Sequence, residues 1–226
     1  MTKYTTLLLD ADETLLDFTA AECYAIRKTC EDFGIPFSET VRKTYSEINL
    51  SLWKQLEKGL CSREEIKLRR FVIFAEAMSV SADPSAMSEA YVKALSSCGI
   101  LLSGAEALCK KLGEKYKLYI VTNGLAEVQK SRLALSGLLP FFSGCFISEE
   151  SGSAKPKKEF FDFVFDRIEE KDKSKICIIG DSLSSDVAGG INAGIDSCHF
   201  CRDEVPEDDP ATMVARSFEE IEKIFL

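Results

Sequence analysis

The sequence predicts an α/β protein in which a parallel β-sheet core carries an inserted, all-helical domain. From about residue 100 onward, helical periodicity alternates with short apolar runs, which is typical of a parallel sheet covered by helices on both faces. The stretch 17–98 shows helical periodicity alone, although a strand-like run precedes it. We therefore expect the core to comprise residues 1–16 and 99–226, and the helical domain to comprise residues 17–98.

The first expected strand is TTLLLD at 5–10, a short apolar run that ends in an acid. Continuous apolar runs of this length are typical of buried parallel strands. Four helices follow it, and their apolar stripes cover 21–33, 41–56, 62–77 and 84–98. The SREE sequence at 62–65 indicates a capping box for the third helix, and Asp83 before Pro84 indicates the start of the fourth.

The second half of the chain alternates helices with strands. The expected strands are 117–124, 144–148, 175–182 and 197–201. The expected helices are 104–113, 125–137, 157–169, 184–193 and 217–225. Residues 202–212 are charged and contain proline, so we expect a surface loop there. The strand at 5–10 has no partner among the helices that follow it, and it must therefore join this sheet.

Composition restricts the classes of partner and location. The net charge of −9 argues against a nucleic acid polymer or an anionic membrane as the partner. We expect a cytoplasmic protein, because the sequence has neither a membrane-spanning apolar run nor the apolar region of a signal peptide. The odd number of cysteines, nine, and their scattered spacing favour buried, reduced thiols. Cys198 and Cys201 flank the only histidine, His199, but the alternation there favours a strand over a metal site.

Reactive side chains follow three of the expected strands, at the end where open parallel sheets bind ligands. Each of them alone is typical of an ordinary turn or helix cap, whereas their order along the chain indicates a site. They are Asp10, Asp12 and Thr14 after the first strand, Thr122 and Asn123 after the second, Lys155 in a loop, and Asp181 and Asp186 after the strand at 175–182.

The four aspartates of this set would repel one another, since only one lysine accompanies them. A phosphate substrate would add about two further negative charges. The cluster therefore requires a divalent cation. Mg²⁺ fits best, because it binds carboxylate and carbonyl oxygens and bridges to phosphate.

Four short motifs resemble the signature motifs of the haloacid dehalogenase superfamily, whose members are mostly phosphohydrolases. They are DADET (10–14), VTN (121–123), AKP (154–156) and GDSLSSD (180–186). The resemblance covers nearly the whole chain, because the family places an α-helical cap where residues 17–98 lie. It implies a Rossmann-like core and Mg²⁺ as cofactor. The opening DADETLLDF further resembles the subgroup that hydrolyses pyrimidine nucleoside 5′-monophosphates.

The resemblance implies a catalytic role for three residues. Asp10 would attack phosphorus and form an aspartyl-phosphate intermediate. Asp12 would protonate the leaving alkoxide and then take a proton from the attacking water. Lys155 would stabilise the charge of the transferring group. An acid at position 12 favours phosphatases over dehalogenases, because a carbon–halogen bond needs no proton donor. Glu13 departs from the pattern, since many relatives have glycine there.

The remaining motif residues are expected to bind phosphate and metal. Thr122, Asn123 and Lys155 would bind the phosphate, and Thr14 would orient the first loop. The implied metal ligands are the carboxylates of Asp10 and Asp181 and the backbone carbonyl of Asp12, with Asp186 supporting them from behind.

Three functions stay open at this point. The first is a Mg²⁺-dependent phosphatase for nucleoside 5′-monophosphates. The second is the same chemistry on another small phosphorylated metabolite, such as a sugar phosphate or phosphoglycolate, or a phosphomutase. The third is a non-catalytic phosphate-binding domain, against which the intact acid and lysine set argues. Leaving-group contacts are expected from Phe18, Trp53, Arg69 and Arg70, although each also fits a core or solvated position.

Overall fold

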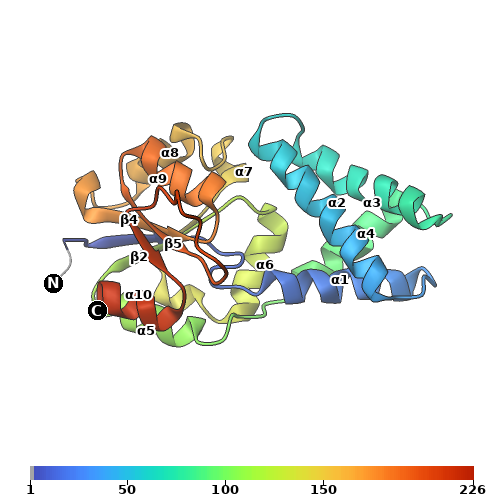
Figure 1. Ribbon diagram of the computed structural model, residues 1–226, viewed down its shortest axis with the longest axis horizontal. Coiled ribbons are helices and arrows are strands. Elements are labelled where there is room, and N and C mark those ends of the chain that lie inside the picture. Colours follow the sequence, from blue (N-terminus) through green and yellow to red (C-terminus); the bar gives the residue numbers. More distant parts are fainter. Residues whose placement is uncertain (1–2) are drawn as a thin grey trace.

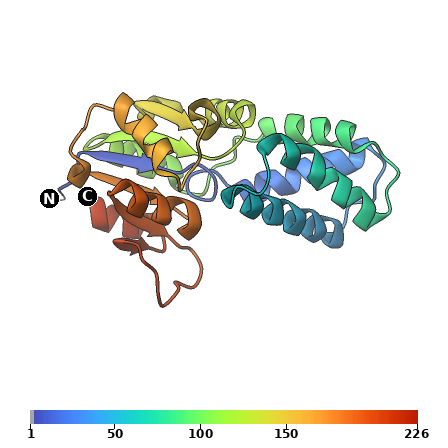
Figure 2. The same ribbon diagram turned by 90° about the horizontal axis from the view of Figure 1, so that it is seen from above.

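The computed structural model describes residues 3–226, so the first two residues of the expected core segment lie outside the described residues. The described chain forms two parts (Figure 1). One is a β-sheet with helices on both faces, which we call the core, and the other is a bundle of four helices within residues 18–96, which we call the cap. Seen from above, the two parts form an elongated, two-lobed molecule (Figure 2).

The core sheet is entirely parallel. Its strands, within the described residues, are β1 (Thr6–Leu9), β2 (Lys117–Thr122), β3 (Gly144–Ile147), β4 (Ile176–Gly180), β5 (Asp196–Phe200) and β6 (Met213–Ala215). Their order is β3-β2-β1-β4-β5-β6, and Leu7 of β1 pairs with Leu118 on one side and Cys177 on the other. The predicted α/β fold is therefore confirmed, with the strand after the N-terminus in the middle of the sheet. The prediction missed β6, because three residues carry too little periodicity.

Successive side chains of β1 point to opposite faces of the sheet, as the geometry of a strand requires. Leu7 and Leu9 pack with α5 (Ala105–Gly113) and α10 (Phe218–Phe225). Leu8 packs on the other face with α8 (Lys158–Arg167). All three leucines are fully buried, and each such burial stabilises the fold by about 1.5–3 kcal/mol. The sheet is thus held between two layers, and only its ends are available for a site.

The cap has a hydrophobic core of its own. Its helices are α1 (Phe18–Asp32), α2 (Glu39–Glu57), α3 (Arg63–Met78) and α4 (Pro84–Ser96). The rings of Tyr45, Phe71 and Tyr91 pack at its centre, with centroids 5.0 Å apart for Tyr45 and Tyr91. The capping box of α3 and the Asp83 cap of α4 are both present, which confirms the predicted starts of these helices.

The chain passes between core and cap through two adjacent segments. Leu16 forms an antiparallel bridge with Leu101. The Asp17 N–H donates to the Ile100 carbonyl at 2.9 Å, and the Leu102 N–H donates to the Leu15 carbonyl at the same distance. We keep residues 17–98 as the proposed limits of the inserted domain, because these paired segments lie at its two ends.

The other core elements connect the strands. They are α6 (Ala126–Ser136), α7 (Ser148–Ser151), α9 (Ala188–Ala193) and short 3-10 turns at Leu139–Phe141 and Lys173–Lys175. A π-helical turn, Leu183–Val187, stands where the sequence predicted the start of an α-helix. Across residues 3–226, the helices are all too short or too polar to cross a membrane.

Candidate active site

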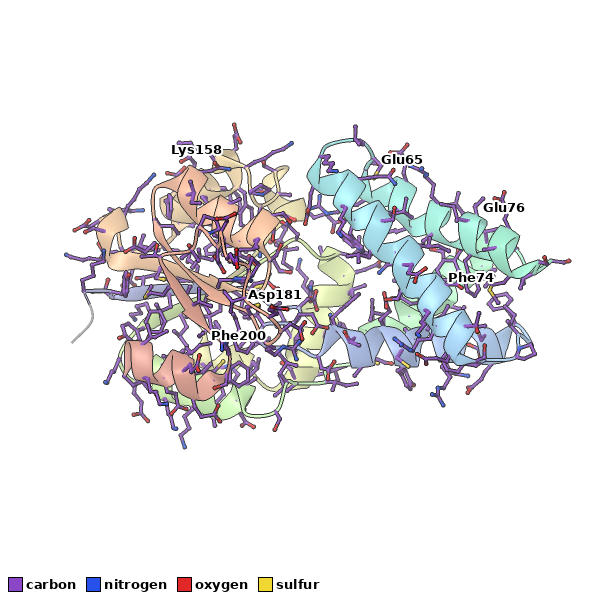
Figure 3. All side chains as sticks on the ribbon, viewed as in Figure 1. Glu65, Phe74, Glu76, Lys158, Asp181 and Phe200 are labelled. Atoms are coloured by element: carbon purple, nitrogen blue, oxygen red, sulfur yellow. The ribbon has the colours of Figure 1, made fainter. Side chains whose placement is uncertain are left out.

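The carboxyl ends of the central strands face the cap, and a cavity of about 560 Å³ lies between the two parts. Asp181, which follows β4, lies at this end of the sheet (Figure 3). The cavity is lined by loops after β1, β2 and β4 and by the inner faces of the cap helices. All the residues predicted from the four motifs except Thr14 line it, so the structure brings together Asp10 and Asp186, which lie 176 residues apart in the chain.

Lys155 lies at the centre of the site and is 1% exposed. Its ammonium group donates to Asp10 Oδ1 at 2.5 Å, to Asp186 Oδ1 at 2.6 Å and to the Val121 carbonyl at 2.8 Å. All three of its N–H groups are therefore used. Burial acts to lower the pKa of Lys155, but the two adjacent carboxylates raise it above its ordinary value. Lys155 is thus held as a buried cation between two acids.

Three carboxylates converge beside this lysine. Ligand atoms of Asp10, Asp181 and Asp186 all lie within 4.8 Å of one another. Burial is the main cause that raises the pKa of Asp10, and burial together with the charge of Asp186 raises the pKa of Asp181 to about 7. One lysine cannot neutralise three such groups. Their oxygen donors and excess negative charge fit a hard divalent cation.

The backbone after β4 explains how Asp186 reaches this cluster. A Cβ atom on Gly180 would lie 2.3 Å from Asp186 Cγ, so only glycine lets this side chain approach the end of the strand. The π-helical turn then places the Asp186 Oδ2 atom 3.1 Å from the Ser182 N–H, which donates to it. π-Helical turns are rare overall, but those that do occur are often found at functional sites.

Asp12 is held by two residues of α6 that the sequence analysis did not identify. Gln129 Nε2 donates to Asp12 Oδ2 at 2.5 Å, and Arg132 Nη1 donates to Asp12 Oδ1. Arg132 is buried, and its Nε also donates to the Cys98 carbonyl at 3.0 Å. The one signal in the sequence was a pair of polar residues three positions apart on a helix, between the apolar residues Val128 and Leu133.

The predicted phosphate ligands take different positions. Thr122 Oγ1 accepts hydrogen bonds from the Gly124 N–H at 3.2 Å and from Gln129 at 3.1 Å, which leaves its own proton to donate into the cavity. The side chain of Asn123 instead holds the lysine loop, because both of its polar atoms bond the Lys155 backbone at 2.9 Å. A phosphate contact from Asn123 therefore has to come from its backbone.

The loop after β1 adopts a conformation that favours glycine. Glu13 has φ 58°, in the left-handed region, which explains why glycine is a natural choice there. Its carboxylate accepts from the Thr19 N–H at 2.6 Å and pairs with Arg202. Thr14 Oγ1 lies 3.5 Å from Asp181 Oδ1, at the limit of a hydrogen bond. Glu13 thus links the loop after β1 to the start of α1.

Three of the four cap residues that were predicted to contact the leaving group line the cavity. Phe18, Trp53 and Arg70 line the cavity, whereas Arg69 is exposed and lies outside its lining. The cap also touches the core across the cavity mouth. Glu57 accepts from Ser184 Oγ at 2.9 Å, and Arg63 donates to Ser148 Oγ.

The single histidine supports the loop after β4. His199 Nδ1 lies 2.5 Å from Asp209 Oδ2, and its Nε2 lies 3.0 Å from the Asp181 carbonyl. Both ring nitrogens therefore have oxygen partners, and His199 lies in β5, which confirms the strand predicted for this segment. All nine cysteines fall within the described residues and are free thiols.

Comparison with known proteins gives a consistent result. A family model described as haloacid dehalogenase-like hydrolase matches residues 4–194. The HAD-hydrolase YfnB of Bacillus subtilis is 41% identical over 98% of this chain and 95% of its own length. Pyrimidine 5′-nucleotidase PynA of Streptococcus pneumoniae is 39% identical over 87% of this chain and 84% of its own length. Pyrimidine 5′-nucleotidase YjjG of Escherichia coli is 32% identical over 98% of this chain and 98% of its own length. A crystal structure of YfnB bound to magnesium superimposes with a TM-score of 0.93 at 39% identity and covers 99% of both chains.

Proposed function

This chain belongs to the haloacid dehalogenase-like hydrolases, and from that premise we propose that it is a Mg²⁺-dependent phosphatase for nucleoside 5′-monophosphates. One observation carries the proposal: Asp10, Asp12, Lys155 and Asp181 line a single cavity that the cap covers. The nucleotide part of the proposal is supported by the resemblance to PynA and YjjG. The free cysteines support a cytoplasmic location.

The metal would be held by the carboxylates of Asp10 and Asp181 and by the backbone carbonyl of Asp12. Asp186 bonds Lys155 and the Ser182 N–H, so it would support these ligands from behind. When bound, Mg²⁺ would neutralise the charge that the carboxylates and the phosphate share. The magnesium in the YfnB crystal structure supports this choice of cation.

In the first step, a carboxylate oxygen of Asp10 attacks phosphorus while the bond from phosphorus to the ester oxygen breaks. The leaving alkoxide takes a proton from Asp12. Thr122 donates a hydrogen bond to a phosphoryl oxygen, and Lys155 stabilises the negative charge that develops. The products of this step are the free nucleoside and a phosphorylated Asp10.

In the second step, water attacks the phosphorus of the intermediate and gives a proton to Asp12. The bond between phosphorus and Asp10 breaks, so the carboxylate and inorganic phosphate are released. Asp12 has lost its proton to the alkoxide before this step, and the hydrogen bonds that Gln129 and Arg132 donate to its two oxygens suit the resulting carboxylate. Gln129 and Arg132 hold that base in place.

Phosphate release tests the proposal. We expect the wild-type protein with Mg²⁺ to hydrolyse uridine 5′-monophosphate, and EDTA to abolish the reaction. Asp10→Asn should be inactive, because the amide cannot act as the nucleophile. Asp12→Asn should slow both steps, and mass spectrometry should then detect a phosphorylated Asp10. An Asp10→Asn variant that turned over at the wild-type rate would rule out the covalent mechanism.

A further inference from the structure

The wall of the cavity that the cap helices form, which we call its roof, contains a buried polar cluster that the proposed chemistry does not use. Glu22 of α1 is 6% exposed, and Asn49 of α2 and Arg70 of α3 are each 2% exposed. All three line the same cavity as Asp10 and Asp12. Charged groups are rarely buried so deeply without a structural or binding role. Their place opposite the catalytic loops therefore needs an explanation.

The cluster is ordered by hydrogen bonds. Asn49 Nδ2 donates to Glu22 Oε1 at 2.8 Å, and Arg70 Nη1 donates to Asn49 Oδ1 at 3.4 Å. The Asn49 amide is thus fixed in one orientation between a carboxylate and a guanidinium. The Arg70 guanidinium also lies over the ring of Tyr91, 4.5 Å from its centroid. The cluster therefore presents an acceptor and several donors at fixed positions.

The donors of this cluster are not all satisfied within the protein. Arg70 Nε and Nη2 are buried and have no hydrogen-bond partner among the described residues. Burial also raises the pKa of Glu22, although Ser46, Asn49 and Arg70 oppose that rise. A cluster that only stabilised the cap would be expected to satisfy its own buried donors. Both atoms are closed to water in this structure, so a ligand with hydrogen-bond acceptors would satisfy these donors once the guanidinium turned toward the cavity.

Aromatic side chains lie on the same faces of the cap helices. Phe18 is one helical turn from Glu22 on α1, and Trp53 is one turn from Asn49 on α2. Both are partly exposed and line the cavity. Spacing of four residues places each pair on one face of its helix. The roof therefore combines flat apolar surfaces with a fixed donor and acceptor set, which suits a planar, polar ring.

We propose that Glu22, Asn49 and Arg70 bind the edge of the substrate's nucleobase, with Phe18 and Trp53 in contact with its faces. This inference rests on the proposed function. A pyrimidine base presents an N–H beside a hydrogen-bond acceptor, which complements a cluster that offers a carboxylate acceptor and guanidinium donors. A sugar phosphate without a base has no such edge. The cavity volume of about 560 Å³ lies within the range of small-molecule sites, so one cavity can hold both base and phosphate.

The test compares kcat/KM for uridine 5′-monophosphate with that for ribose 5-phosphate, which lacks the base. We expect the wild-type protein to prefer the nucleotide at least tenfold. In Glu22→Gln, the new glutamine should turn its oxygen toward Asn49 Nδ2, because that group donates a hydrogen bond. Its NH₂ group then takes the place of the other carboxylate oxygen of Glu22. The nucleotide preference should then fall about tenfold to hundredfold, the range for one hydrogen bond to a charged group.

A matched pair of adjacent arginines gives the control. Arg70→Lys keeps the charge but removes the planar fork of donors, so the nucleotide preference should fall. Arg69→Lys makes the same change at the exposed neighbour and should keep the wild-type preference. Circular dichroism melting should confirm that each variant is folded. Glu22→Gln keeps the test valid if Arg70→Lys fails to fold.

Binding of uridine, which has the base but no phosphate, separates the two proposals. Calorimetry should show that uridine binds the wild-type protein and binds Glu22→Gln at least tenfold more weakly. A protein that binds uridine in this way but releases no phosphate would overturn the proposed function and support the base site. A wild-type protein that hydrolyses the nucleotide and ribose 5-phosphate equally well, or variants that keep the full preference, would overturn the base site.

Discussion

Replacing Lys155 by methionine should destabilise the metal-free protein strongly. Methionine keeps an unbranched side chain that is one atom shorter, and it removes all three hydrogen bonds of the ammonium group. The side chains of Asp10 and Asp186 are only 10% and 2% exposed, so neither carboxylate can recover its hydration. Removal of one partner from a buried ion pair costs about 3–5 kcal/mol, and two acids lose their partner here. We therefore expect the upper end of this range.

The loss of folding stability in Lys155→Met should increase as the pH rises. Burial raises the pKa of Asp10, and Lys155 opposes that rise. In the variant nothing opposes it, so the folded protein binds a proton at Asp10 where the unfolded chain does not. A raised folded-state pKa gives stability that is present at low pH and is lost as the pH rises. The variant should therefore lose more stability at about pH 8 than at about pH 5.

Urea unfolding in EDTA, followed by circular dichroism at both pH values, measures this effect. Lys158→Met is the matched control, because Lys158 is exposed and its pair with Asp162 lies on the surface of α8. Such surface pairs contribute about 0–1 kcal/mol. If Lys155→Met lost no more stability than Lys158→Met, or lost the same amount at both pH values, the buried-cation account of the site would be wrong.

Three further predictions concern neighbouring groups. The pKa of Asp181 is raised to about 7, so the metal-free protein should become less stable as the pH rises from about 4 to 7, and Mg²⁺ should reduce this slope in urea titrations. Gly180→Ala should lower the free energy of unfolding by about 1–3 kcal/mol and should lower kcat, because the added Cβ would lie 2.3 Å from Asp186 Cγ. Thermal melting and phosphate release measure the two effects, and unchanged values would contradict the close approach. Arg132→Lys should lower kcat about tenfold with little change in KM, because Asp12 loses a well-placed donor; a change in KM alone would contradict this role.

Much of the arrangement of the candidate site could be predicted, because the ends of the strands can be recognised in the sequence. The acid after TTLLL and the acid after CIIG follow adjacent strands, β1 and β4, so parallel pairing alone brings Asp10 and Asp181 to one edge. The π-helical turn could not be predicted in this way, since it depends on local packing around Asp186. The sequence likewise gave no measure of how deeply Lys155 would be buried.

Side chains on helices were harder to place, because a helix face must be known before its polar residues can be assigned. Arg70 lies four residues after Ile66 and four before Phe74, on the buried stripe that the sequence predicted for α3. Arg69 is rotated by about 100° from it and is exposed. The same periodicity could therefore have separated the two arginines. It could not show that Gln129 contacts Asp12, because that contact joins residues 117 positions apart.

The contacts between core and cap differ in strength on the two sides of the cavity. On the side where the chain crosses, the buried Arg132 bonds both Asp12 and the Cys98 carbonyl, and its guanidinium lies 5.6 Å from the centroid of the Phe18 ring. At the mouth, the contact between Glu57 and Ser184 is exposed, whereas the one between Arg63 and Ser148 is partly buried. Exposed polar contacts contribute about 0–1 kcal/mol, whereas loss of a buried partner costs several times more. The contact between Glu57 and Ser184 is therefore the weakest of these contacts, and its loss leaves the two donors of Asp12 in place.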